Sequence, residues 1–296
     1  MNFNLINVQT LHAKWLTDQK VSLDVLRLDS IHPVISGNKW FKLKYYLQEA
    51  ATLHKAAVAT FGGAWSNHIA AVAFACKEAA LKSVGIIRGE QPIALSETLK
   101  KAMEYGMDLH FVTREEYRQK PLITQKFENK NWYWIDEGGY GALGAKGASE
   151  ILRIVDTSVY SHIIAAAGTG TMLAGLLLAA EKNLKVIGIS CMKGNFSLES
   201  QVLNLVGSQK PKASFEIIHN YHFGGYGKHP SALIDFINEM YADHRLPLDI
   251  VYTGKTLYGI KDLTEKDFFE PGSRVLMIHS GGLQGNNSLP ANVLLF

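Results

Sequence analysis

Residues 162–175 have the sequence HIIAAAGTGTMLAG, in which an apolar run leads into a glycine-rich turn and then into an apolar helical pattern. The apolar run, 162–166, predicts a strand covered on both faces, as in a parallel sheet. The pattern over 172–181 predicts a helix. A strand, a short turn and a helix in this order are the repeating unit of an α/β fold with right-handed crossovers.

The same alternation continues along the chain. Residues 114–131 are polar and irregular and predict a surface loop, and the glycines of 138–147 predict a hinge or boundary. Ligands in such folds bind beyond the carboxyl ends of the strands. Further strands are predicted at 58–61, 83–87, 109–112, 133–135, 186–190, 250–252 and 275–278, and further helices at 68–80, 98–105 and 147–155.

Composition narrows the class of protein. The chain has 296 residues, of which 47% are hydrophobic and 19% charged, enough for one large or two modest globular domains. A net charge of +3 without a basic block indicates neither a nucleic-acid nor a membrane partner. No membrane span or secretion signal is evident. Cys76 and Cys191 lie in apolar surroundings, so we expect free buried thiols in a cytoplasmic protein.

Lys39 lies in the run ISGNKWFKL, residues 35–43. A lysine at the start of a helix is disfavoured as a cation by the helix dipole. Partial desolvation lowers its pKa further, and a neutral amine can attack an aldehyde. The alternative is a solvated lysine that follows a glycine turn.

Two glycine-rich turns open helices after strands. In TFGGAWSNH, residues 60–68, Ser66 and Asn67 offer a hydroxyl, an amide and backbone N–H groups suited to a carboxylate, or Ser66 simply caps the helix. In the turn of residues 168–172, small residues and threonines suit a phosphate, or the glycines allow close packing of strand and helix. The second turn lacks the Gly-Lys-Ser/Thr of a P-loop and the later acidic residue of a dinucleotide site.

Other chemistries find little support. His219, His222 and His229 match no zinc spacing, and no Gly-x-Ser-x-Gly elbow is present, so no metal is predicted. A reactive lysine, a phosphate cradle and a carboxylate-binding turn are together what pyridoxal phosphate needs when it is held as a Schiff base.

On these residues the chain resembles the 1-aminocyclopropane-1-carboxylate (ACC) deaminase and D-cysteine desulfhydrase family, of the tryptophan-synthase-β-like group. The resemblance runs from about residue 27 to 283. It implies fold type II, with two three-layer α/β/α domains of mostly parallel strands, a small amino-acid substrate and a homodimer. It further implies a large cofactor-binding domain, 1–42 plus 141–296, a smaller inserted domain, 43–140, and a cofactor in the cleft between them. The motifs that carry it are 37–39 with 42–43, 62–63 with 66–67, 168–175, 224–227, 251–255 and 279–282.

The resemblance also implies roles for single residues. Lys39 corresponds to the lysine that binds the cofactor aldehyde and later moves protons, with Asn38 beside it. Ser66 and Asn67 correspond to the pair that holds the substrate carboxylate; Asn67 also lies near the cofactor, Ser66 assists in removing the α-proton, and Trp65 narrows the pocket. The remaining implied positions are the phosphate cup Gly168, Thr169, Gly170, Thr171 and Met172, the active-site tyrosines Tyr226 and Tyr252, Thr253 facing the pyridine nitrogen, and Ser280 next to the ring.

Thr253 bears on the choice of substrate. An acidic residue there makes the cofactor ring a strong electron sink, which opening a cyclopropane ring requires. The deaminases of the family carry Glu at this place and leucine at that of Ser280, and this chain has neither. The resemblance therefore favours β-elimination from D-cysteine, to pyruvate, hydrogen sulfide and ammonia. The alternatives are ACC deamination, to 2-oxobutyrate and ammonia, and a weakly catalytic carrier or regulator that holds pyridoxal phosphate.

Overall fold

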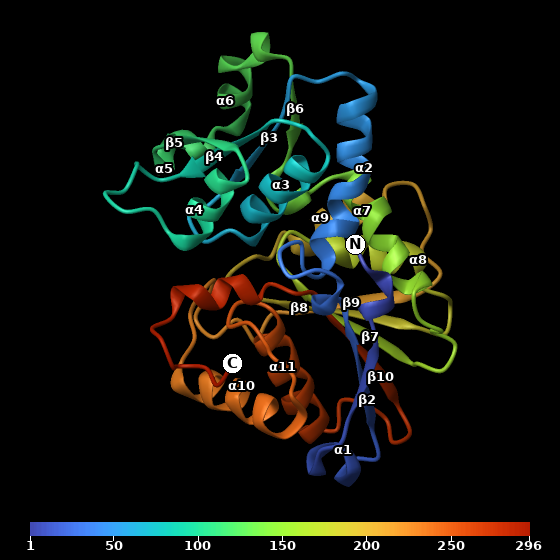
Figure 1. Ribbon diagram of the computed structural model, residues 1–296. Helices are drawn as coiled ribbons and strands as arrows, with labels where there is room; N and C mark the ends of the chain where they lie inside the picture. The colour runs from blue at the N-terminus through green and yellow to red at the C-terminus, as the bar shows by residue number, and fades with distance from the viewer.

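A computed structural model describes residues 1–296, which form two sheets with helices on both faces of each (Figure 1). The larger sheet has the strand order β1-β2-β10-β7-β8-β9, and only the β1–β2 pair is antiparallel. The smaller sheet has the order β5-β4-β3-β6 and is parallel throughout. The strands are β1 (Val8–Leu11), β2 (Ser22–Arg27), β3 (Ala57–Gly62), β4 (Ser83–Arg88), β5 (Met107–Val112), β6 (Trp132–Ile135), β7 (His162–Ala167), β8 (Lys185–Ser190), β9 (Ser214–Ile218) and β10 (Arg274–His279).

Helices bury both faces of the larger sheet. One hydrophobic cluster joins it to α7, α8 and α9, and another joins it to α1, α10 and α11. Helix α2 runs between the two sheets, with Phe41 in the core of the larger and Leu43 and Leu47 in that of the smaller. The helices are α1 (Lys14–Asp18), α2 (Asn38–Thr52), α3 (Asn67–Glu78), α4 (Glu97–Glu104), α5 (Arg114–Arg118), α6 (Lys120–Lys126), α7 (Ala142–Ser149), α8 (Thr171–Ala179), α9 (Leu198–Val206), α10 (Ser231–His244) and α11 (Thr253–Glu265).

The parallel α/β architecture predicted from the alternation is confirmed, and seven of the eight predicted strands are present. The predicted strand at 250–252 is wrong, because these residues form the turn that leads into α11. The loop predicted for 114–131 is also wrong, since Tyr117 and Ile123 anchor α5 and α6 to the smaller sheet. Three strands were not predicted: β1, β2 and β9.

The glycines of 138–147 lie where the chain leaves β6 and enters α7, and two of them allow close packing of helices. Residues 142–149 form α7, which packs against α2 and α8. A Cβ on Gly147 would lie 1.8 Å from the Phe41 carbonyl oxygen, and one on Gly144 would lie 2.2 Å from that of Gly139. Only glycine allows backbones to approach so closely.

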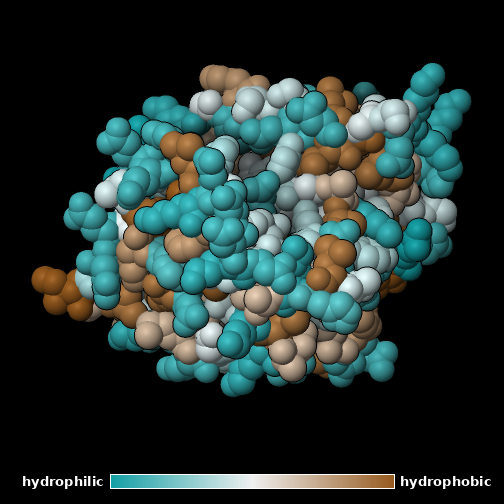
Figure 2. Space-filling view, turned by 90° about the horizontal axis from the view of Figure 1, so that it is seen from above, coloured by the Kyte–Doolittle hydropathy of each residue, from teal (hydrophilic) through white to brown (hydrophobic).

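The smaller sheet spans residues 57–135 and so lies inside the segment predicted as an inserted domain, 43–140; the domain limits themselves stay a prediction. No helix has the length and apolar character needed to cross a bilayer. Seen from above, hydrophilic side chains cover much of the surface and hydrophobic ones lie in smaller separate groups (Figure 2).

Candidate active site

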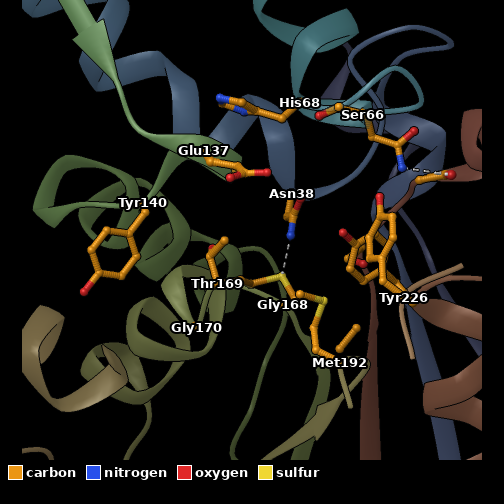
Figure 3. A pocket seen from close by; sticks show the side chains of 18 of the residues that line it. Asn38, Ser66, His68, Glu137, Tyr140, Gly168, Thr169, Gly170, Met192 and Tyr226 are labelled. Carbon is orange, nitrogen blue, oxygen red and sulfur yellow. Dashed lines mark hydrogen bonds between the residues drawn. The ribbon is translucent and has the colours of Figure 1, made fainter. Parts of the chain in front are cut away.

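A cavity of about 820 Å³ lies between the two sheets, where the carboxyl ends of their strands face each other. The first turns of α2, α3 and α8 reach it, together with Arg88 at the end of β4 and the segments that follow β6, β8 and β10. Figure 3 shows Asn38, Ser66 and Glu137 around it. This is where ligands bind in open parallel sheets. Of the sequence-predicted site residues, the cavity wall contains Asn38, Lys39, Trp65, Ser66, Asn67, Gly168, Thr169, Gly170, Met172, Tyr226, Tyr252 and Ser280.

Lys39 lies in the first turn of α2. Gly37 precedes this helix at a φ of 66°, and a Cβ there would lie 1.9 Å from the Ser280 carbonyl oxygen. The Lys39 ammonium donates to Asn38 Oδ1 at 2.8 Å. Burial lowers the pKa of Lys39 to about 8, although the charge of Asp249 acts in the opposite direction. The lowered pKa predicted from the sequence is confirmed, with burial as the main cause.

Asn38 connects the start of α2 to the start of α8. Its Nδ2 lies 3.1 Å from Met172 Sδ, in the first turn of α8. Its backbone N–H donates to the Ser280 carbonyl oxygen at 3.1 Å. Lys39 is therefore fixed beside both the 168–172 turn and the loop that follows β10.

The first turn of α3 is capped by Ser66 and still has unpaired hydrogen-bond donors. Ser66 Oγ accepts from the Ile69 N–H at 3.4 Å, so the capping role is present. The Ser66 hydroxyl hydrogen and the backbone N–H groups of Asn67 and His68 have no acceptor within the protein. Asn67 Nδ2 donates to the Gly282 carbonyl oxygen at 3.2 Å, which ties this turn to the loop after β10. Unpaired donors at a helix N-terminus suit a carboxylate.

The turn before α8 has the features of an anion cradle. The backbone N–H groups of Thr169, Gly170, Thr171 and Met172 have no acceptor within the protein. Gly170 adopts a φ of 76°, and a Cβ there would lie 2.9 Å from Val202. Thr171 is fully buried behind the wall, and its hydroxyl lies 3.0 Å from that of Thr169. Four free N–H groups at a helix N-terminus fit a phosphate dianion.

Tyr226 and Tyr252 form an edge-to-face pair on the cavity wall. Their ring centroids are 6.1 Å apart, with an angle of 72° between the ring planes. Burial raises the pKa of Tyr252 well above its ordinary value. Tyr252 is therefore a neutral phenol near pH 7, and its hydroxyl can donate a hydrogen bond into the cavity.

Thr253 is the predicted site residue whose position differs most from the expectation. It is fully buried behind the wall, and its hydroxyl donates to Asp249 Oδ1 at 2.7 Å and accepts from the Asp249 N–H at 2.8 Å. The cause is local, because the Asp249 carboxylate also accepts the N–H groups of residues 251–253 and so caps α11. The sequence analysis did not single out Asp249.

The sequence analysis also missed several charged residues on the wall. Lys42 donates to the Gly138 carbonyl oxygen at 3.2 Å, and its pKa falls well below the ordinary value because of burial and of the charge of Lys39. Lys120 pairs with Glu137 at 3.0 Å. Most of the missed residues lie directly after a strand or a recognised motif, so their place in the sequence could have indicated the cavity wall. The missed wall residues include Lys42, His68, Arg88, Lys120, Asp136, Glu137, Tyr140, Met192 to Asn195 and Gln201.

The three histidines considered for a metal make separate contacts. His219 Nε2 lies 2.7 Å from Glu199 Oε1, while His222 and His229 bond to the backbone of their own loop.

The residues present fit pyridoxal phosphate. Four open N–H groups suit its phosphate, and a lysine of lowered pKa stands on the same cavity wall to hold its aldehyde. When bound, this group supplies stabilisation of negative charge on a substrate α-carbon.

Comparisons with known proteins agree with this fit. Residues 11–281 match the family described as "Pyridoxal-phosphate dependent enzyme". A "Putative 1-aminocyclopropane-1-carboxylate deaminase" of Pyrococcus abyssi is 31% identical over 272 residues, which are 85% of this chain and 81% of that protein. The "Bifunctional D-cysteine desulfhydrase/1-aminocyclopropane-1-carboxylate deaminase, mitochondrial" of Arabidopsis thaliana is 30% identical over 280 residues, 85% of this chain and 70% of that one.

Among solved structures, the crystal structure of an "ACC deaminase homologue" superimposes with a TM-score of 0.80 at 26% identity and covers 95% of this chain and 90% of its own. With the family match over residues 11–281, the protein belongs to the pyridoxal-phosphate-dependent enzymes of fold type II, in the ACC deaminase and D-cysteine desulfhydrase family.

Proposed function

We propose that the protein is a lyase that converts D-cysteine and water to pyruvate, hydrogen sulfide and ammonia. The observation that carries the choice of substrate is that position 253 holds the neutral Thr253, where the deaminases of the family carry Glu, and that position 280 holds Ser280, where they carry Leu. Thr253 lies behind the cavity wall with its hydroxyl bonded to Asp249, so it brings no acidic group to the wall. A neutral neighbour leaves the cofactor ring a weaker electron sink, which is sufficient when a stabilised thiol leaves from the β-carbon. The relative in Arabidopsis, which bears both activities in its name, supports the proposal.

Each wall residue has a proposed task. Ser66, with the free N–H groups of Asn67 and His68, binds the substrate carboxylate and orients the α-hydrogen. Lys39 would hold the cofactor aldehyde, and its neutral amine would take the α-proton of the substrate. Tyr226 and Tyr252 close one side of the cavity, and the neutral Tyr252 hydroxyl donates a hydrogen bond to the departing sulfur.

A second candidate is ACC deamination, which would release 2-oxobutyrate and ammonia. The names of the Pyrococcus relatives favour it. Opening the cyclopropane ring needs a stronger electron sink, because carbon is a poor leaving group. A third candidate, a carrier with little catalysis, would not need the free donors at the start of α3.

Product analysis separates the three. The holoenzyme is incubated with D-cysteine and, separately, with ACC, and sulfide, ammonia and keto acid are measured. Sulfide and pyruvate from D-cysteine, abolished in Lys39→Ala and retained in the exposed-surface control Lys266→Ala, support the proposal. Oxobutyrate from ACC without sulfide from D-cysteine would select the deaminase. No product from either would favour the carrier or a substrate other than these two. A homodimer and a cytoplasmic location stay predictions.

A further inference from the structure

Lys255 is a buried lysine that the reaction outlined above does not use. It lies in the first turn of α11 and is 0% exposed. No carboxylate lies within ion-pair distance of its ammonium. A lysine is almost never fully buried unless its ammonium is paired or hydrogen-bonded. Its partners therefore indicate why it is there.

The partners are two backbone carbonyls of one loop. Lys255 Nζ donates to the His222 oxygen at 3.0 Å and to the Gly225 oxygen at 2.8 Å. The same two oxygens accept loop N–H groups, from Gly225 and Lys228 respectively. The ammonium therefore joins two consecutive turns of the loop by charge-assisted hydrogen bonds, which are stronger than neutral ones.

This loop, residues 219–230 between β9 and α10, has few contacts with the rest of the protein besides those of Lys255, among them the pair of His219 with Glu199 and the packing of Phe223 on Tyr258 of α11. Its backbone has positive φ at Phe223 (52°), Gly224 (93°), Gly225 (130°) and Gly227 (69°). Phe223 is not a glycine, so its left-handed conformation needs support from its surroundings. Besides Lys255, α11 holds the start of the loop, where the Tyr221 hydroxyl donates to Asp262 Oδ2 at 2.7 Å.

The loop delivers Tyr226 to the active site. Tyr226 follows Gly225 directly, lies on the cavity wall and packs edge-to-face on Tyr252. Figure 3 shows Tyr226 at the side of the cavity opposite Tyr140. Its ring is 45% exposed, so packing alone does not hold it.

We propose that Lys255 is a positioning residue that holds the 219–230 loop, and with it Tyr226, against the cavity. The role of Tyr226 in the reaction rests on the proposed function, whereas the position of the loop does not. Methionine at 255 would fill the same space without a donor and would leave each of the two carbonyls with one hydrogen bond instead of two. The loop would then open while α11 remains in place.

The test compares Lys255→Met with the control Lys261→Met. Lys261 lies on the same helix, and its side chain forms only a surface ion pair with Glu265. Hydrogen exchange is measured on both holoenzymes. We expect the amides of Gly225 and Lys228 to exchange at least about tenfold faster in Lys255→Met, with α11 and the cofactor absorbance unchanged. The control should match the wild type throughout. Unchanged exchange in the loop would overturn the proposal.

A kinetic cycle asks whether Lys255 acts through Tyr226. Turnover with D-cysteine should fall by up to about 100-fold in Lys255→Met, and Tyr226→Ala should lower it much less in that variant than in the wild type. If the fold-decrease in turnover of the double variant equals the product of the two single decreases, the two residues act independently and the proposed link is wrong. If the wild type turns over neither D-cysteine nor ACC, the proposed function fails, and loop exchange still decides the position of the loop.

A second variant covers a failure of Lys255→Met to fold. Lys255→Ala is measured with and without methylammonium, which can enter the space left by the side chain. Restored protection of the Gly225 amide would support the proposal. Exchange that methylammonium leaves unchanged would count against it.

Discussion

Gly37 and Gly207 have nearly the same backbone conformation in different surroundings. Gly37 precedes α2 at φ 66° and ψ −140°, and Gly207 follows α9 at φ 63° and ψ −138°. A Cβ on Gly37 would lie 1.9 Å from the Ser280 oxygen and 2.4 Å from the Gly281 nitrogen, whereas one on Gly207 would meet nothing within 4 Å. Alanine at the two positions therefore carries the same backbone strain, and only position 37 adds a steric clash.

The magnitudes follow from these contacts. Backbone strain alone should cost Gly207→Ala about 1–3 kcal/mol. In Gly37→Ala the start of α2 and the loop after β10 must also separate, because both clashing atoms belong to the backbone. This should cost about 1–3 kcal/mol more. The separation stretches the bond from the Asn38 N–H to the Ser280 oxygen and moves Lys39.

Urea unfolding of both variants measures the difference, and titration with pyridoxal phosphate measures its effect on the site. We expect Gly37→Ala to be less stable than Gly207→Ala by at least about 1 kcal/mol. It should also bind the cofactor at least about tenfold more weakly, with Gly207→Ala like the wild type. Equal stability and equal cofactor affinity in the two variants would refute the described packing of α2 on the β10 loop.

Three further outcomes are expected. Because the pKa of Lys39 is lowered to about 8, the rate at which the cofactor-free protein takes up pyridoxal phosphate should rise about tenfold per pH unit below pH 8 and level off above it. Stopped-flow absorbance measures this rate, and a rise that continues to pH 10 would contradict the lowered pKa. Asp249→Asn removes a charge that raises the pKa of Lys39, so the pH at which cofactor uptake levels off should fall. The free energy of unfolding should also fall, by at least about 2 kcal/mol, because the carboxylate that caps α11 is lost. A decrease as small as that of the exposed-site control Asp18→Asn would count against this cap. Burial raises the pKa of Cys76 and of Cys191 to about 12, so both thiols should react with Ellman's reagent at pH 8 far more slowly in the native than in the urea-unfolded protein, and fast native reaction would disprove their burial.

The features that could be predicted from sequence are those with local causes. Parallel strands buried on both faces are apolar throughout, so β7 and β8 were evident. The turns before α3 and α8 could be recognised because glycine and small polar residues at a helix start have few other uses. The lowered pKa of Lys39 followed from its place at the start of α2, although burial by distant segments turned out to be its main cause.

The misses have non-local causes or ambiguous patterns. Strand β2 contains Asp24, a buried acid that interrupts the apolar run and is satisfied by Thr10 at 2.6 Å and Tyr160 at 2.8 Å. The apolar residues 250–252 have the pattern of a strand, but the Asp249 carboxylate holds their N–H groups in a turn. Helix α5 did carry a signal, the capping box formed by Thr113 and Glu116.

The site shows the same division. The cavity residues on helix starts belong to recognisable motifs, whereas Arg88 ends β4 and Glu137 follows β6, with no motif around either of them. The burial of Thr253 behind the wall depends on Asp249, and that of Lys255 on a loop 30 residues away. Neither relation is visible until the chain is folded.

The central claim is that the Lys39 amine carries pyridoxal phosphate. Reduction of the holoenzyme with borohydride, followed by proteolysis and mass spectrometry, fixes the cofactor to the nitrogen that holds it. The account predicts a single phosphopyridoxyl group on the peptide that contains Lys39. A group on Lys42 or Lys255 instead, or no covalent group at all, would contradict it.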